Sequence, residues 1–299
     1  MNEIEDIEPG IQRIVLNTKQ LYSDGEERRQ FKARLREFLE IDTSSEIIGY
    51  KNGVLSYLTE SVIPTKQDSR PPLLLLFGNP APDSVRHKCF FAAEKGRSEH
   101  RFWPILEKAG IILFKNTAEE INTFRTRSLF NLDYESPFRI GLAVFYSMPS
   151  PASDLKWNGV AGLRKLFGAR AFREITACEK KRVESIIQEF IGDDIRGAVI
   201  AFQKDAYLGV KDDNSQESVV VEEGKWCAIE ARCSSSKIRL FRMPPTRYMN
   251  APWYVDFLRA VSGLFWEFDC SNRNLEEVSS LTSGHQLVPA AQETPLLRP

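Results

Sequence analysis

The sequence is poor in the residues that build common metal and redox sites. Its 299 residues include three histidines and five cysteines, and no two cysteines have the C-x-x-C spacing. This pattern argues against a disulfide framework, a zinc ribbon and an iron–sulfur cluster. The few histidines also leave little material for histidine-based metal centres or Ser-His-Asp catalysis. We therefore expect reduced thiols and no requirement for a metal or cofactor.

Long apolar runs are missing as well. No stretch reaches the roughly 18 consecutive apolar residues expected of a transmembrane helix. The first residues, MNEIEDIEPG, are acidic, whereas a secretory leader is basic and then apolar. These absences predict a protein that has no membrane partner and works inside the cell, in the cytoplasm or, in a eukaryote, in the nucleus.

The net charge of −1 hides an uneven distribution. Residues 83–127 contain nine Lys or Arg against six Asp or Glu, and residues 160–182 contain seven against two. Residues 237–247 add four basic residues and no acidic one. If folding brings the three segments together, they form a basic face suited to a polyanion. From charge alone, solvated helix faces are the simpler interpretation.

Residues 1–68 are predicted to form an N-terminal helical extension. One helix is expected within EERRQFKARLREFLEID, and a second over residues 53–62. The segment PTKQDSRPP then has the composition of a linker. The apolar residues at helical spacing in the first helix are Phe31, Leu35, Phe38 and Leu39.

Strands and helices alternate over residues 69–269. Helical periods are found at 102–109 and 183–190, and another helix is expected after Pro252. The alternation predicts an α/β domain, a three-layer α/β/α sandwich with a mostly parallel central sheet. Residues 270–299 show no sustained period and are expected to be a disordered tail. Short apolar runs predict buried strands at 73–77, 140–146, 197–202 and 237–243.

The first of these strands ends in an unusual way. In LLLLFGNPAPDS, the apolar run stops at an asparagine between a glycine and two prolines. Ligands of open α/β sheets bind outside the carboxyl ends of the strands. The prolines stiffen this loop and Gly78 leaves room beside the backbone, so Asn79 can be held in one orientation. A turn that merely ends a strand accounts for these residues equally well.

An aromatic pair follows in HKCFFAAEKGRSEHRFWPILEKAGI. Phe90 and Phe91 lie outside any periodic pattern, before a helix that begins near Arg101. Beside a fixed amide, such a pair could stack on a planar heterocycle. Burial in the core is nevertheless the commoner fate of two adjacent aromatic residues.

Together these two stretches resemble the first signature region of the uracil-DNA glycosylase superfamily, most closely its mismatch-specific branch. In that branch a strand ends in G-x-N-P-G, an aromatic residue follows, and a helix opens with R-F-W and ends in A-G. Asn79 and Phe91 occupy the corresponding places. Three weaker resemblances follow in the expected order, so that the likeness spans residues 70–266. They are IGLAVFYSMPSP, GAVIAFQKDAY and LFRMPPTRYMNAPW.

The chain departs from the family at two places. Ser147 stands where the family has an asparagine that reads the base, and a hydroxyl cannot make the paired donor and acceptor contacts of an amide. The second signature, H-P-S or N-P-S, is replaced by Pro245-Thr246, without a histidine. The mismatch-specific branch also lacks this histidine and relies on the asparagine of the first signature. The recognised base therefore stays open.

The resemblance implies a DNA glycosylase-like hydrolase that flips a damaged or deaminated, uracil-like base out of DNA and cleaves its N-glycosidic bond. Asn79 would position the attacking water. Thr246 would bind a phosphate, while Arg247 or Tyr248 fills the gap in the duplex. The base would be held by Gly78, Phe90, Phe91, Tyr146 and Ser147. Further phosphate contacts would come from Arg86, Lys88, Arg97, Arg164, Lys165 and Arg170.

Two other hypotheses stay open. A nucleic-acid-binding protein that keeps the fold but has lost catalysis is favoured by Ser147 and the missing histidine. An α/β hydrolase or binding protein for small nucleotides is the other, with the resemblance confined to strand and loop geometry. Single- or double-stranded DNA is the expected partner under the first two hypotheses. Turnover of free nucleosides without DNA affinity would indicate the third.

Overall fold

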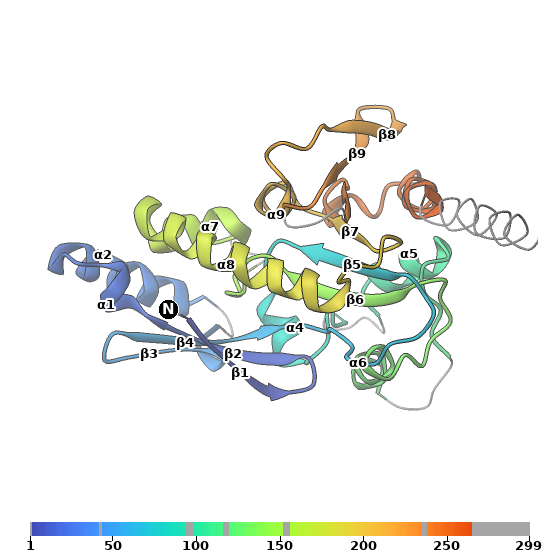
Figure 1. The fold of residues 1–299 in the computed structure, drawn as a ribbon. Coiled ribbons are helices and arrows are strands. Elements are labelled where there is room, and N and C mark those ends of the chain that lie inside the picture. The colour runs from blue at the N-terminus through green and yellow to red at the C-terminus, as the bar shows by residue number, and fades with distance from the viewer. Residues whose placement is uncertain are drawn as a thin grey trace, which may run out of the picture.

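The computed structural model describes residues 2–41, 44–93, 99–115, 120–151, 156–234 and 238–264. At its centre lies a six-stranded sheet (Figure 1). Its strands are β5 (Pro72–Phe77), β6 (Arg139–Val144), β7 (Ala198–Ala201), β8 (Ser218–Glu223), β9 (Trp226–Arg232) and β10 (Arg239–Arg242). They are arranged in the order β6–β5–β7–β10–β9–β8. The first four in this order run parallel, and β9 and β8 form an antiparallel hairpin at one edge. The chain is therefore a mixed α/β protein with a mostly parallel sheet, as the sequence predicts.

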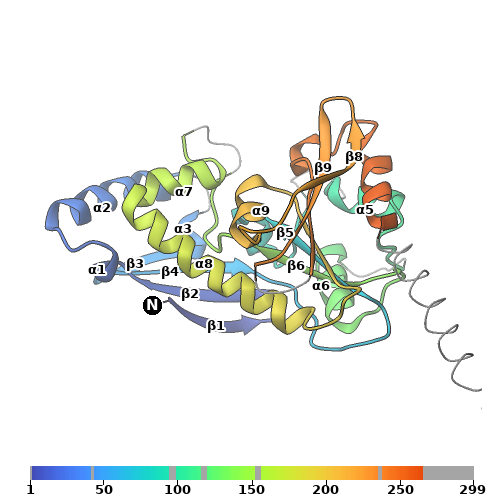
Figure 2. The same cartoon turned by 45° about the horizontal axis from the view of Figure 1, so that its top comes forward.

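The parallel part of this sheet is buried on both faces. Along β5, Leu74 and Leu76 belong to one apolar cluster, whereas Leu73 and Leu75 belong to a second. Strands that are buried on both faces form continuous apolar runs, which is why the sequence reveals them. Helix α8 lies across one face of the sheet (Figures 1 and 2). The first cluster includes residues of α7 (Gly159–Phe167), α8 (Ala169–Phe190) and α9 (Lys204–Val210). The second cluster includes residues of α5 (Phe102–Lys108), α6 (Ile121–Asn131) and the helical residues 254–264.

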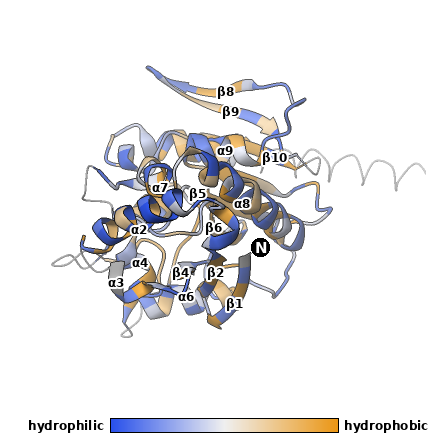
Figure 3. Ribbon diagram, turned by 90° about the vertical axis from the view of Figure 1, so that its left-hand side faces the viewer, coloured by the Kyte–Doolittle hydropathy of each residue, from blue (hydrophilic) through white to orange (hydrophobic). Residues whose placement is uncertain are grey.

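Two shorter elements complete this part of the chain. Helix α4 (Pro82–Arg86) follows the loop after β5, and a 3₁₀ turn at Thr246–Tyr248 follows β10. The β8–β9 hairpin, which the sequence did not reveal, extends away from the body (Figure 3). Its strand β8 is mostly exposed and carries acidic residues, so it lacks the apolar run of a buried strand.

The N-terminal region contains a second sheet. Its strands are β1 (Asn2–Glu8), β2 (Ile11–Asn17), β3 (Ile48–Lys51) and β4 (Val54–Glu60), in the order β1–β2–β4–β3 and antiparallel throughout. Its helices are α1 (Thr18–Leu21), α2 (Gly25–Leu39) and α3 (Ser44–Ile47). The expected helix containing Phe31, Leu35 and Phe38 is α2, and these three side chains are buried.

The helix expected over residues 53–62 is wrong. This segment forms β4, in which Leu55, Tyr57 and Thr59 are buried while Ser56 and Leu58 are only partly covered. Burial at every second residue is the period of a strand with one face on a core. The N-terminal region is therefore mixed α/β and not simply a helical extension.

The N-terminal region is joined to the main sheet. Ile14 and Phe31 belong to the same apolar cluster as α7 and α8. Val62 exchanges two backbone hydrogen bonds with Leu142 of β6, of 2.9 and 2.8 Å. The Tyr22 hydroxyl also donates to the Phe167 carbonyl oxygen at 2.7 Å. The segment before β5 thus pairs with one edge of the main sheet.

Within the described residues, every helix is too short or too polar to cross a membrane. The expected tail of residues 270–299 lies outside the described residues.

Candidate functional site

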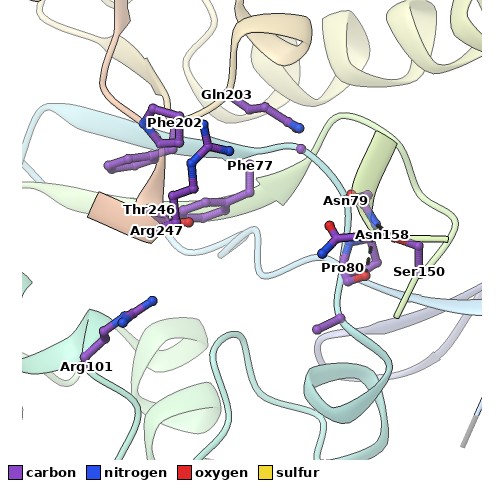
Figure 4. Close-up of a pocket in the computed structure, with 14 residues that line it drawn as sticks. Phe77, Asn79, Pro80, Arg101, Ser150, Asn158, Phe202, Gln203, Thr246 and Arg247 are labelled. Carbon is purple, nitrogen blue, oxygen red and sulfur yellow. Dashed lines mark hydrogen bonds between the residues drawn. The ribbon is translucent and has the colours of Figure 1, made fainter. Parts of the chain in front are cut away.

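A cavity of about 500 Å³ opens at the carboxyl ends of β5, β7 and β10 (Figure 4). The chain leaves β5 toward β6 on one side, and leaves β7 toward β10 on the other. Because these connections diverge, a crevice forms between the ends of β5 and β7, which is the usual ligand position in an open α/β sheet. Three strand-end loops line it, at residues 77–81, 202–203 and 245–247. Arg101, Ser150, Asn158 and Gly159 complete the lining.

Asn79 lies in this cavity with a fixed orientation. Its Nδ2 donates hydrogen bonds to Ser150 Oγ at 2.8 Å and to the Pro80 carbonyl oxygen at 3.3 Å. A carbonyl can only accept, so the amino group of the amide must face this side. Ser150 is 2% exposed and comes from the loop after β6. In the described part of the chain no donor contacts Asn79 Oδ1, which is left to accept a hydrogen bond from a water or a ligand.

Gly78 and Gln203 approach each other closely across the crevice. A Cβ atom on Gly78 would lie 1.4 Å from Gln203 Oε1, so the Gln203 side chain occupies space that only glycine leaves open. Gln203 directly follows Phe202 at the end of β7. The sequence reasoning singled out Gly78 but did not single out Gln203.

Phe91 does not line the cavity. Its ring stacks on Phe102, with centroids 4.1 Å apart, and meets the edge of Phe77 at 5.0 Å. Trp103 Nε1 donates to the Phe91 carbonyl oxygen at 3.2 Å. Residues 102 and 103 therefore hold Phe91 behind Phe77, and it is Phe77 that reaches the cavity. Phe90 is also buried, 5.8 Å from the Phe77 ring.

Ser147 and Tyr146 do not reach the cavity either. The Ser147 backbone N–H and hydroxyl both donate to Glu179, and its Oγ lies 2.9 Å from the Tyr57 hydroxyl. Burial and the nearby Glu179 raise the pKa of Tyr57, so that it stays a neutral phenol. Ser147 thus joins β4 to α8. Tyr146 stacks on Phe172 with centroids 5.1 Å apart.

The turn after β10 brings two of its three expected residues to the site. Thr246 and Arg247 line the cavity, whereas Tyr248 packs against Trp226 with centroids 4.3 Å apart. Arg101 also lines the cavity. Within the described residues, neither Arg101 nor Arg247 forms an ion pair, so their charges are available to an anion. Arg101 and Arg247 approach the cavity from different elements (Figure 4).

Most of the other expected phosphate contacts have acidic partners or lie elsewhere. Arg164 and Lys165 are exposed on α7, Lys88 pairs with Glu8 at 2.8 Å, and Arg97 lies outside the described residues. Carboxylates therefore neutralise part of the positive charge from which the sequence predicted a basic face. The remaining pairs are Arg86 with Asp83 and Glu46, and Arg170 with Glu27 and Glu174.

The cavity carries hydrogen-bonding and cationic groups but, in its described part, no carboxylate or histidine. Glu99 is paired with the buried Arg125 and so is not a free base. In the part of the chain that the structure describes, no group of three or more His, Cys, Asp or Glu could hold a metal. The arrangement can orient a water through Asn79, hold a planar ligand and stabilise negative charge.

Sequence reasoning missed several lining residues. Gln203 could have been found, because it directly follows a predicted strand at the same edge as Asn79. Arg101 precedes the Phe-Trp pair of the R-F-W run and could also have been included. Ser150 and Asn158 carry no local signal, since loops that follow β6 bring them to Asn79.

No protein-family model and no curated protein matches this chain. The geometry of the cavity and the chemistry of its residues are therefore the basis for assigning a function.

Proposed function

We propose that this protein is a DNA glycosylase-like hydrolase that acts inside the cell on a damaged or deaminated, uracil-like base. The observation that carries the proposal is the fixed Asn79 amide in the crevice between β5 and β7. The resemblance of residues 73–111 to the first glycosylase signature supports the same assignment. We also assign the three-layer α/β/α arrangement of that superfamily, since strand residues face an apolar cluster on each side of the sheet.

Hydrolysis breaks the bond between the sugar carbon and the base nitrogen and forms a bond from that carbon to water. Asn79 Oδ1 accepts a hydrogen bond from the water and aims its lone pair at the sugar carbon. An amide is not basic, so Asn79 contributes orientation and the water's proton passes to solvent. The base leaves with the bonding electron pair, and Arg101 and Arg247 stabilise the developing negative charge.

The cavity is suited to an extruded nucleotide. Its volume of about 500 Å³ is in the range of small-molecule sites. Flipping a base out of the stack costs a few kcal/mol, least at a mismatch. Thr246 and the exposed Arg247 form the edge of the cavity, where a phosphate or the gap in the duplex would lie. Contacts there would offset part of the flipping cost.

A second candidate is a nucleic-acid-binding protein on the same fold that no longer cleaves the glycosidic bond. The described lining of the cavity has no carboxylate or histidine, and Ser147 is buried away from it. These two observations favour binding without catalysis. Under this hypothesis Asn79 contacts the nucleotide but does not orient a reactive water.

A gel assay of base release tests the proposal. The substrates are oligonucleotides with uracil or another modified base, opposite guanine and in single strands. We expect release of at least one base by the native protein and a rate about 100-fold lower for Asn79→Ala, with DNA binding retained. The matched control is Asn214→Ala, an exposed asparagine outside the cavity.

The outcomes separate the two candidates. Salt-dependent DNA binding with no base release by any variant would contradict the enzyme and favour the binding protein. An absence of DNA binding at low salt would contradict both. Equal rates for the native protein and Asn79→Ala would remove Asn79 from the mechanism.

A further inference from the structure

Gln203 carries an unpaired hydrogen-bonding group at the cavity. It occupies the N-cap position of α9, yet its side chain makes no capping hydrogen bond. Its Oε1 is buried and, in the described part of the chain, has no hydrogen-bond partner. Buried polar atoms of folded proteins nearly always have a partner, so this unpaired acceptor indicates a ligand donor, which reaches it when the Gln203 amide turns from Gly78 toward the cavity.

Two glycines hold Gln203 in this place. Gly78 leaves the space that the Gln203 amide fills, since a Cβ there would lie 1.4 Å from Oε1. On the next turns of α9, a Cβ on Gly209 would lie 2.1 Å from the Phe145 ring. The helix therefore packs directly against Phe145, which follows β6, so the start of α9 has a fixed place relative to the main sheet. Figure 4 shows Gln203 extending above the loop that carries Asn79.

The same cavity has an aromatic wall. Phe77 is the last residue of β5 and Phe202 directly follows the neighbouring strand β7, and their rings stack with centroids 5.1 Å apart and planes 8° apart. Such a wall suits a planar ring. A glutamine beside it offers one acceptor and one donor side by side, which pairs with a ring edge that carries an adjacent N–H and carbonyl.

We propose that Gln203 is the residue that reads the base. Its Oε1 accepts from the ring N–H, and its Nε2 donates to the adjacent carbonyl of a uracil-like base. The assignment rests on the proposed function and gives to Gln203 the role that the sequence resemblance placed at Ser147. Asn79 then acts at the sugar and Gln203 at the far edge of the base, from two different strand ends.

The experiment compares the full chain with Gln203→Met and Gln203→Glu. Methionine keeps the length of the side chain without its hydrogen bonds, and glutamate keeps an acceptor but loses the donor. Two readouts are used, the affinity for free uracil by titration calorimetry and the single-turnover release of uracil from DNA. We expect roughly ten- to a hundredfold weaker uracil binding and slower release for both variants. Binding of undamaged DNA should not change, because the phosphates contact other residues.

Gln216→Ala, at an exposed glutamine outside the cavity, is the matched control and should behave as the native protein. Uracil binding and release that are the same in the native protein and Gln203→Met would overturn the proposal while leaving the proposed function intact. Native protein that neither binds uracil nor releases any base would contradict both. If Asn79→Ala loses base release but still binds uracil, and Gln203→Met loses base release and uracil binding, the proposed function and the role of Gln203 are both supported.

Discussion

At the scale of single residues, the orientation of Asn79 depends on Ser150. The Ser150 hydroxyl is the nearer of the two acceptors that hold the Asn79 amino group, at 2.8 Å. Ser150→Ala removes this acceptor and lets the amide rotate. A hydrogen bond of this kind contributes about 1 kcal/mol, so we expect kcat to fall by about fivefold while KM stays unchanged.

Steady-state kinetics of base release check this prediction, with Ser150→Thr as the matched variant. Threonine keeps the hydroxyl and should restore most of kcat. A loss that is equal in Ser150→Ala and Ser150→Thr, or one that is confined to KM, would contradict a positioning role.

Glu60 is a buried carboxyl that makes stability depend on pH. It is 4% exposed, and burial raises its pKa well above the usual value of 4.5. At a pH above 4.5, the Glu60 carboxyl stays protonated in the folded protein but is ionised in the unfolded chain. The stabilising contribution of Glu60 is therefore complete at low pH and is lost as pH rises toward the folded-state pKa, by about 1.4 kcal/mol for each unit of elevation.

Glu60→Gln should remove this dependence, since glutamine is neutral throughout. We expect the Tm of Glu60→Gln to exceed that of the native protein by an amount that grows as pH rises from 4.5 to 8. The Tm difference between the two proteins should be smallest at pH 4.5. Thermal unfolding across this range provides the measurement. If the Tm of the two proteins changes with pH in the same way, Glu60 is not the group that makes stability depend on pH.

At the scale of elements, two helical glycines have opposite surroundings. A Cβ on Gly209 would meet the Phe145 ring at 2.1 Å, whereas one on Gly263, in the helical residues 254–264, meets no described atom within 4 Å. We expect Gly209→Ala to destabilise the fold by about 1–3 kcal/mol through overpacking. Gly263→Ala should stabilise it by about 0.5–1 kcal/mol through higher helix propensity.

Denaturant unfolding of the two variants measures both effects, and each serves as the control for the other. Gly209→Ala should also slow base release, because α9 carries Gln203. Equal stabilities for the two variants would contradict the close packing of α9 on β6.

The sequence predicted the elements that are buried on both faces. Among the parallel strands, β5, β6 and β7 appear as largely apolar runs, and α2 shows a clear helical period. Strand β4 was mistaken for a helix because a short run such as VLSYLTE fits both periods. The β8–β9 hairpin was missed because its outer strand β8 is mostly exposed and carries acidic residues, so it lacks an apolar run. Both elements form strands because of hydrogen bonds to neighbouring strands, and their own residue patterns do not show this.

The candidate site was predictable where it follows directly from strand ends. Asn79, Thr246 and Arg247 come after strands of one sheet and meet at its carboxyl edge. Ser147 also follows a strand, β6, but its hydroxyl turns to Glu179 and becomes buried. Which way a side chain leaves a strand end depends on packing from distant segments, which a sequence pattern does not show.

At the scale of the whole molecule, charge near the cavity matters more than the net charge of −1. Arg101 and Arg247 line the cavity without acidic partners among the described residues. Besides stabilising the leaving base, each of these cations can contact one phosphate of the flipped nucleotide. If it does, Arg101→Ala and Arg247→Ala should each lower the slope of log affinity against log salt by about one. Fluorescence anisotropy with a short duplex at several salt concentrations gives these slopes.

Arg29→Ala is the control for this measurement. Arg29 is an exposed cation on α2 that pairs with Glu26 at 2.6 Å and does not line the cavity. Its loss should leave the slope unchanged. Identical slopes for the three variants and the native protein would place the DNA contacts elsewhere on the surface.

We propose that the crevice between β5 and β7 holds an extruded nucleobase. A crystal structure of the full chain with a G·U duplex, whose deoxyuridine carries a 2′-fluorine that slows cleavage, tests it most directly. We expect the uracil ring in the cavity against Phe202, its N–H and carbonyl edge on Gln203, and its sugar carbon beside Asn79. A uracil that stays stacked in the duplex, or that lies outside this cavity, would contradict it.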